Sequence, residues 1–292
     1  MTKKKILVPV DFSDQSLIAL GQSYNLARKY QAEITLLYVI EDHGLVSKLF
    51  SKEQDDSLKK QVEENLTKLA ADVEKKQGIN VTTMVARGSV YDKVAEVADM
   101  ISALFIIMGT NGATNIKRKF IGSNALRVVR EANVPVITIR GQHHRDGCKN
   151  IVLPLDLTKE TREKVNFAIE LGKLGDGSAI RIVSVLFTTD EFVVNRLTRQ
   201  LQQVKQFIEK EGIVCTAEII KGIKKEETLA QSIINYAHKV EGDLIMIMTQ
   251  QEQDFTYRFI GSSAQEIINT SDIPVISIIP SMKRNIVSVT PY

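Results

Sequence analysis

Cysteine is scarce in this chain of 292 residues, which has only Cys148 and Cys215. Their positions fit neither a disulfide framework nor the paired spacing of a zinc site. We therefore expect two reduced thiols in a cytoplasmic protein and no bound metal at these residues.

An excess of charge of either sign is also lacking. Lys and Arg number 38 and Asp and Glu 35, so the formal net charge is only +3. A nucleic-acid-binding domain usually concentrates Lys and Arg on one face. We expect no nucleic-acid partner, and the 43% hydrophobic and 25% charged composition is that of an ordinary globular protein.

Long apolar runs are missing as well. No stretch approaches the roughly 18–20 apolar residues needed to cross a bilayer. The N-terminal stretch MTKKKILVPVDFSD starts with basic residues, but its apolar run is short and is broken by Asp11. It lacks the apolar core and cleavage site of a secretory signal, so we expect no membrane partner.

What the sequence does contain is internal repetition. Four segments of the first half return in the same order in the second half. They are KKILVPVDFSDQS (4–16) as KNIVLPLDLTKET (149–161), AEITLLYVI (32–40) as AIRIVSVL (179–186), ALFIIMG (103–109) as DLIMIMT (243–249), and NVPVITIR (133–140) as DIPVISII (272–279). Any two α/β domains share Val/Ile-rich strands, but the matching Pro-x-Asp and Phe-Ile-Gly-Ser motifs argue against that alternative. We predict two copies of one domain, residues 1–141 and 149–283.

Each copy alternates strand patterns with helix patterns. The strands are short and almost continuously apolar, which is typical of strands buried on both faces of a parallel sheet. The helical segments, such as residues 16–30 and 58–76, space their apolar residues at helical intervals. Five strands and four helices in each copy predict an α/β fold, a doubly wound parallel sheet with helices on both faces.

Ligands of such folds bind in the loops that follow the strands. The first strand ends at Pro9-Val10-Asp11, and the fourth opens into GTNGATNIKRKFIGSN (109–124). Glycine lets the backbone approach a phosphate closely, and a helix N-terminus offers free N–H groups to an anion. This loop therefore has the features of a phosphate cradle, although glycine with a capping residue also opens many ordinary helices.

The spacing Gly-x2-Gly-x9-Gly-Ser after the fourth strand, together with Val-Pro-Val-Asp after the first, resembles the universal stress protein family. The loop is neither a Walker A motif nor a Rossmann Gly-x-Gly-x-x-Gly. The resemblance covers the whole chain as a tandem two-domain member. It implies an adenine nucleotide alpha hydrolase-like fold with strand order 3-2-1-4-5, which would place Asp11 and Gly109 beside one crevice.

Nucleotide-binding members of that family bind ATP, so the resemblance implies an ATP site in the first copy. The implied residues are Pro9, Val10 and Val39 around the adenine, Asp11 on the ribose hydroxyls, Met108 and Gly109 below the ribose, and Gly112, Gly122, Ser123 and Asn124 on the phosphates. An alternative role for Asp11 is a turn or cap ahead of the next helix.

The second copy retains only part of this loop. The segment TQQEQDFTYRFIGSS (249–263) keeps Gly261-Ser262, and Asp156 is kept as well, but the two earlier glycines are gone and the loop reads one residue shorter. Glu252 would add negative charge where phosphates should lie. We expect this copy to bind nucleotide poorly or not at all.

Candidates for catalysis are few. No Ser-His-Asp set, Cys-His pair or metal cluster is readable in the sequence. Asp11 would be able to help hold Mg²⁺ for slow ATP hydrolysis, but a fast ATPase needs a base near the γ-phosphate, and we find none. We expect a nucleotide-binding regulator of the stress response; the alternatives are a slow ATPase and an interaction protein that binds no nucleotide.

The last strand of each copy bears on assembly. Members of the family commonly dimerise by pairing this strand, and a bare edge strand invites such pairing. Here residues 136–139 would meet residues 275–279 within one chain. We expect either this intramolecular pseudo-dimer or a homodimer of two chains.

Overall fold

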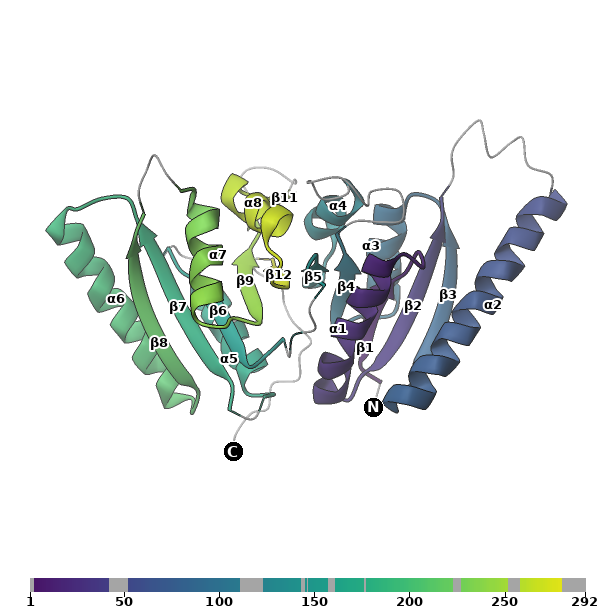
Figure 1. The fold of residues 1–292 in the computed structure, drawn as a ribbon, viewed down its shortest axis with the longest axis horizontal. Coiled ribbons are helices and arrows are strands. Elements are labelled where there is room, and N and C mark those ends of the chain that lie inside the picture. Colours follow the sequence, from purple (N-terminus) through teal and green to yellow (C-terminus); the bar gives the residue numbers. More distant parts are fainter. Residues whose placement is uncertain are drawn as a thin grey trace.

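The computed structural model of the chain describes residues 3–41, 52–110, 123–142, 145, 147–156, 161–175, 177–222, 227–251 and 258–279. These residues form two α/β halves that lie side by side (Figure 1). Among them, no helix is both long and apolar enough to cross a membrane.

Ten strands form one continuous sheet in the order β3-β2-β1-β4-β5-β12-β9-β6-β7-β8. Each half therefore has the strand order 3-2-1-4-5, as the sequence predicts. The strands are β1 (Lys5–Pro9), β2 (Glu33–Ile40), β3 (Val81–Arg87), β4 (Phe105–Gly109), β5 (Val136–Ile139), β6 (Asn150–Pro154), β7 (Ala179–Leu186), β8 (Val214–Lys221), β9 (Leu244–Met248) and β12 (Val275–Ile278). A separate antiparallel pair joins β10 (Gln250–Gln251) to β11 (Arg258–Phe259).

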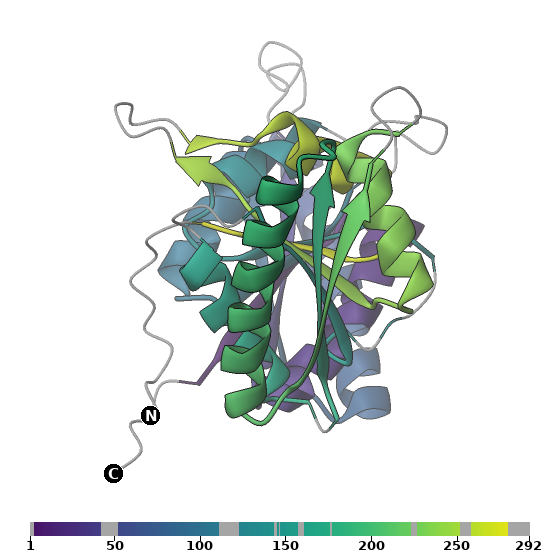
Figure 2. The same ribbon diagram turned by 90° about the vertical axis from the view of Figure 1, so that its left-hand side faces the viewer.

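Helices cover both faces of the sheet. They are α1 (Asp14–Tyr30), α2 (Lys52–Gln77), α3 (Val90–Met100), α4 (Ser123–Glu131), α5 (Thr161–Gly172), α6 (Glu191–Lys210), α7 (Leu229–Lys239) and α8 (Ser262–Thr270). Buried side chains of α1, α2, α5 and α6 belong to one core cluster, and those of α3, α4, α7 and α8 belong to the other. Figure 2, seen from the end of the second copy, shows α6 and α7 on opposite sides of the outer strands.

The two halves meet through an antiparallel pair of strands, β5 and β12. Val275 pairs with Thr138 and Ser277 with Val136, which confirms the predicted pairing of these segments within one chain. The core also crosses this junction, because the rings of Phe105 in β4 and Phe167 in α5 lie 6.4 Å apart, centroid to centroid. Apolar strands that are buried on both faces allow the sheet to continue from one copy into the other.

The strand registers also fix which residues of the two copies are equivalent. In the first copy Ile106 pairs with Val136, and in the second Ile245 pairs with Val275. The backbone agrees, since Ser102 and its counterpart Glu241 both have a φ of 52°.

One consequence corrects the alignment made from the sequence. Gly109 corresponds to Met248, not to Thr249, because Gly109 pairs with Ile139 and Met248 with Ile278. Counted from these positions, Gly122 and Gly261 lie equally far along the chain. The two loops therefore have the same length, and the prediction of a shorter second loop was wrong. The apolar runs FIIMG and LIMIM can be aligned in more than one register, because no side chain in them marks a position.

Candidate functional site

The ends of β1 and β4 lie next to each other in the first copy. Leu7 pairs with Ile106 in parallel register, so the residues that follow them leave the sheet at the same edge. The backbone of Val10 continues this edge and donates a hydrogen bond to Leu37 O over 2.8 Å. Asp11 and Gly109 thus follow neighbouring strand ends, as the strand order implies.

Asp11 is an exposed residue that shapes the turn into α1. Its Oδ1 accepts hydrogen bonds from the backbone N–H of Ser13 at 3.1 Å and from the Ser13 hydroxyl at 2.5 Å. Ser13 in turn caps α1 by accepting from Ser16 N–H, which satisfies one of the free donors of the first helical turn. The turn-forming alternative for Asp11 is therefore observed, and it also holds the carboxylate in a fixed place at the strand end.

Gly109 lies directly against the first turn of α1. A Cβ atom at this position would lie 2.9 Å from the backbone oxygen of Gln15, closer than real Cβ atoms approach. The Gln15 side chain also bridges to β5, because its Nε2 donates to Ile139 O over 2.9 Å. Packing alone therefore accounts for the glycine at the end of β4, and Gln15 is a site residue that sequence reasoning missed.

The side chains of Val10 and Met108 point away from the strand ends into the core. They are 4% and 6% exposed, and they belong to core clusters on opposite faces of the sheet. Val39 packs against the same cluster as Met108. At the edge of the sheet these three residues offer a ligand mainly their backbone atoms.

An aromatic pair borders the same edge. The ring of Phe12, whose φ of 60° lies in the left-handed region, stacks on Tyr38 with centroids 5.4 Å apart. Burial raises the pKa of the Tyr38 phenol, and the nearby carboxylates of Asp11 and Glu41 raise it further. Sequence reasoning missed both rings, since nothing in a strand-like run distinguishes a ring at a strand end from a core residue.

Asn124 ties the start of α4 to the end of β2. Its Nδ2 donates to Glu41 Oε1 over 3.4 Å. Ser123 is the first residue of α4, although its side chain lies outside the described part of the chain. Gly112 and Gly122 lie entirely outside the described residues. The other seven of the ten predicted site residues lie together where the strands end, namely Pro9, Val10, Asp11, Val39, Met108, Gly109 and Asn124.

The prediction for Glu252 in the second loop also falls on a residue outside the described ranges. Within the described ranges, no group of three His, Cys, Asp or Glu side chains is placed to hold a metal ion. Cys148 and Cys215 are both buried free thiols, and burial is the main cause that raises the pKa of Cys215 to about 12.

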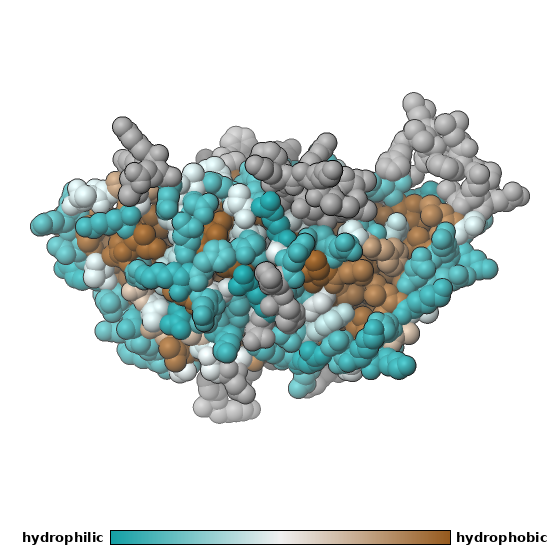
Figure 3. All heavy atoms as spheres, in the orientation of Figure 1, coloured by the Kyte–Doolittle hydropathy of each residue, from teal (hydrophilic) through white to brown (hydrophobic). Residues whose placement is uncertain are grey.

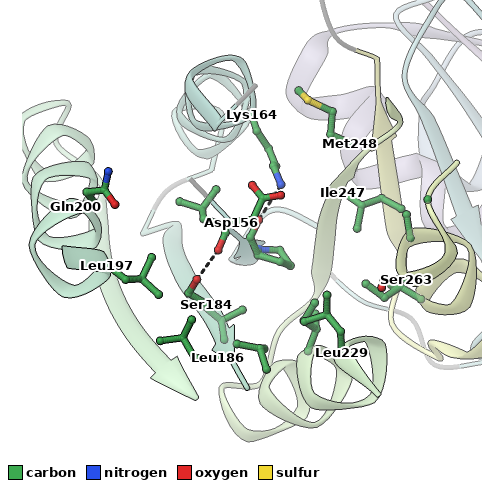
Figure 4. A pocket seen from close by; sticks show the side chains of 18 of the residues that line it. Asp156, Lys164, Ser184, Leu186, Leu197, Gln200, Leu229, Ile247, Met248 and Ser263 are labelled. Carbon is green, nitrogen blue, oxygen red and sulfur yellow. Dashed lines mark hydrogen bonds between the residues drawn. The ribbon is translucent and has the colours of Figure 1, made fainter. Parts of the chain in front are cut away.

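The second copy contains a pocket of about 820 Å³ at the position equivalent to this edge (Figure 4). It lies where β6, β7 and β9 end and is closed by α6, α7 and α8. Pro154, Leu155 and Asp156 line it, and they correspond to Pro9, Val10 and Asp11 of the first copy. Met248, the counterpart of Gly109, also forms part of its wall.

Polar groups of this pocket are held by backbone carbonyls. Lys164 Nζ donates to Pro154 O over 2.8 Å, and the Ser184 hydroxyl donates to Leu155 O over 2.5 Å (Figure 4). Gly261, which lines the pocket, is the N-cap of α8 and has no side chain that could accept a hydrogen bond from the first turn of the helix. This pocket was not predicted from the sequence, because its walls come from elements far apart along the chain.

Known proteins resemble the chain along almost its full length. The model of the universal stress protein family matches residues 3–140 and again residues 147–278. A universal stress protein of Methanocaldococcus jannaschii is 31% identical over 148 residues, which cover 47% of this chain and 82% of that protein. The crystal structure of a universal stress protein from Archaeoglobus fulgidus matches with a TM-score of 0.75 at 21% identity and covers 94% of this chain and 96% of that one. A further Archaeoglobus fulgidus universal stress protein, solved in complex with dAMP, matches 44% of this chain and 97% of its own, with a TM-score of 0.36 at 24% identity.

Proposed function

Because the chain belongs to the universal stress protein family, we propose that its first copy binds ATP or a related adenine nucleotide. The site is the edge of the sheet where β1 and β4 end. The observation that supports this most is a fixed, exposed carboxylate, Asp11, just after the end of β1, the strand that pairs with the Gly109-bearing strand β4. The glycine-bearing loop that starts at Gly109 leads to the N-terminus of α4.

In this proposal each part of the nucleotide meets a different part of the edge. The adenine lies against the backbone of Pro9, Val10 and Val39, and the ribose hydroxyls donate to the carboxylate of Asp11. Phosphate oxygens accept hydrogen bonds from the N-terminus of α4 and from the loop. The residues that take part there are Gly112, Gly122, Ser123 and Asn124. A helix N-terminus attracts anions because its first N–H groups have no partner within the helix.

Binding and regulation fit this site better than rapid turnover. Glu41 accepts a hydrogen bond from Asn124, and the Oδ1 of Asp11 already accepts two hydrogen bonds from Ser13. Such a group can help hold Mg²⁺, but it is poorly suited to take a proton from an attacking water. We propose a nucleotide-dependent role in the stress response; slow hydrolysis of ATP is the second candidate.

The second copy takes no part in nucleotide binding in this proposal. Met248 and Gln251 stand where the first copy has Gly109 and Gly112. Neither residue leaves the backbone as open to a phosphate as glycine does. We also propose residues 1–141 and 149–283 as the two domains, with the second as the degenerate copy.

Assembly and location follow from the same features. β5 and β12 are each paired on both sides within the chain, so a homodimer of two chains would need a surface other than this edge. Two buried free thiols, Cys148 and Cys215, are compatible with a reducing compartment such as the cytoplasm.

The test is to purify the full chain without added nucleotide, denature it, and identify released nucleotides by mass spectrometry. We expect close to one adenine nucleotide per chain, and much less from the Asp11→Asn variant. The matched control is Asp156→Asn, which changes the equivalent residue of the second copy and should leave the amount unchanged. If the wild-type chain carries no nucleotide and binds none when titrated with Mg-ATP, the proposal fails.

A further inference from the structure

The pocket of the second copy has the size of a small-molecule site. Its volume of about 820 Å³ lies within the range of roughly 300–1,000 Å³ that ligand pockets usually occupy. Residues of α6 and α7 both line it, and hydrophobic side chains reach the surface of the second copy in the left half of Figure 3. A cavity of this size at a strand edge is a place for a ligand and not a packing defect, which rarely exceeds the volume of a few water molecules.

One replacement between the copies opens this space. Leu37 pairs with Pro9 and Val183 pairs with Pro154, so the next residues, Tyr38 and Ser184, are equivalent. In the first copy the Tyr38 ring lies at this position and stacks on Phe12. In the second copy the Ser184 hydroxyl turns to a backbone carbonyl, and the volume of the ring is left to the pocket.

The wall of the pocket is mostly apolar. Its larger side chains come from β7, β9, α6 and α7 and include Leu186, Leu197, Leu229, Ile233 and Met248. Such a wall favours the transfer of an apolar group out of water. These side chains offer a ribose or a triphosphate no hydrogen-bond partner.

The charges of the pocket suit a single anionic group. Among the described residues that line the pocket, Lys164 and Arg196 supply two cations and Asp156 one carboxylate, which leaves one positive charge in excess. The N-terminus of α8 adds partial positive charge at Ser262 and Ser263. A triphosphate would exceed this supply, whereas one carboxylate matches it.

The cation belongs to the second copy alone. Lys164 lies as far along the chain from Pro154 as Ala19 lies from Pro9. Ala19 is fully buried against the core, whereas Lys164 reaches into the pocket (Figure 4). The same helix position thus changes from a packing residue to a charged residue that can bind a ligand.

We propose that this pocket binds an amphipathic monoanion, a small molecule with an apolar body and one carboxylate. The apolar body fills the space above Ser184 and lies between α6 and α7. The carboxylate lies between Lys164 and the N-terminus of α8. This site is separate from the nucleotide site proposed for the first copy, and of the outcomes below only competition by Mg-ATP would count against both proposals.

The first test uses 8-anilinonaphthalene-1-sulfonate, which is itself an apolar body with one negative charge. The full chain has no tryptophan, so the fluorescence of this probe can be read with little protein background. We expect saturable binding at one site. Decanoate should displace the probe, decanol should do so roughly fivefold less well, since it lacks the charge, and Mg-ATP should not displace it.

Two variants locate the site. Ser184→Tyr introduces the residue that the first copy has at this position, and it should abolish probe binding while the circular dichroism spectrum stays that of the wild type. Lys164→Met keeps the length of the side chain and should remove the preference for decanoate over decanol; it also carries the test if Ser184→Tyr does not fold. The proposal is overturned if the probe and decanoate do not bind, if a folded Ser184→Tyr binds as before, if Lys164→Met keeps the preference, or if Mg-ATP competes.

Discussion

The ends of β4 and β9 are equivalent places with different chemistry. In the first copy Gly109 lets α1 approach so closely that no side chain would fit. In the second copy Met248 stands at the same position and forms part of a pocket wall. The backbone frame and the loop length are the same, so a few side chains are enough to make these two equivalent places differ.

The largest expected effect concerns the core that joins the copies. Phe105 is fully buried and contacts both Tyr30 of its own copy and Phe167 of the other. Its counterpart in the second copy is the smaller Leu244. Phe105→Ala should lower the free energy of unfolding by about 3–5 kcal/mol, because it leaves a cavity.

Urea denaturation followed by circular dichroism measures this loss. Phe105→Leu, which makes the first copy like the second, is the matched control and should cost less than about 1.5 kcal/mol. Equal losses in the two variants would show that the ring does not join the copies.

The next largest loss of stability is expected when Gly109 at the end of β4 is replaced by methionine, the residue at the equivalent position of the second copy. Gly109→Met should force α1 away, since the new Cβ would lie 2.9 Å from Gln15 O. Overpacking of this kind costs about 1–3 kcal/mol, and ATP binding to the folded variant should be lost. Thermal unfolding and calorimetric titration with Mg-ATP measure the two effects; unchanged ATP affinity would contradict the role given to this glycine.

A smaller effect is expected at the two equivalent aspartates, Asp11 of the first copy and Asp156 of the second. Asp11→Asn removes the charge that accepts the ribose hydroxyls, and it should weaken ATP binding about tenfold, near 1.4 kcal/mol. Asp156→Asn should leave ATP affinity unchanged, because in our proposal the second copy takes no part in nucleotide binding. Calorimetry on both variants decides this, and an equal loss in both would mean that the copies bind alike.

The smallest expected effect is the difference in stability lost when the N-cap residues of two equivalent helices, α7 and α3, are replaced by alanine. Thr228 caps α7 by accepting from Gln231 N–H over 3.1 Å. Ser89 caps α3, but its buried hydroxyl finds no hydrogen-bond partner among the described residues. Thr228→Ala should therefore cost about 1 kcal/mol, whereas Ser89→Ala should cost less than about 0.5 kcal/mol. Urea denaturation compares them; a larger loss for Ser89→Ala would reverse the assignment.

The sequence predicts the fold well because the repeat and the buried strands leave few arrangements. The helices on both faces follow from the alternating apolar runs, whereas the strand order and the pairing of β5 with β12 follow from the resemblance to the universal stress protein family. The register of β9 was misjudged by one residue, since a run of Leu, Ile and Met carries no marker of position.

The site is less predictable for a physical reason. Gln15 and Tyr38 lie in a helix and a strand whose patterns report burial, not the direction of one ring or amide. The pocket at Ser184 arises because a small residue stands where the first copy has Tyr38. A serine within a strand pattern does not indicate how much space is left beside it. Contacts between distant elements decide both features.

The central claim is that one copy of two binds nucleotide. Native mass spectrometry of the full chain with Mg-ATP counts bound nucleotides directly and can be repeated on Gly109→Met and Asp156→Asn. We predict one nucleotide per chain, none after Gly109→Met, and one still after Asp156→Asn. Two nucleotides per wild-type chain would contradict the account.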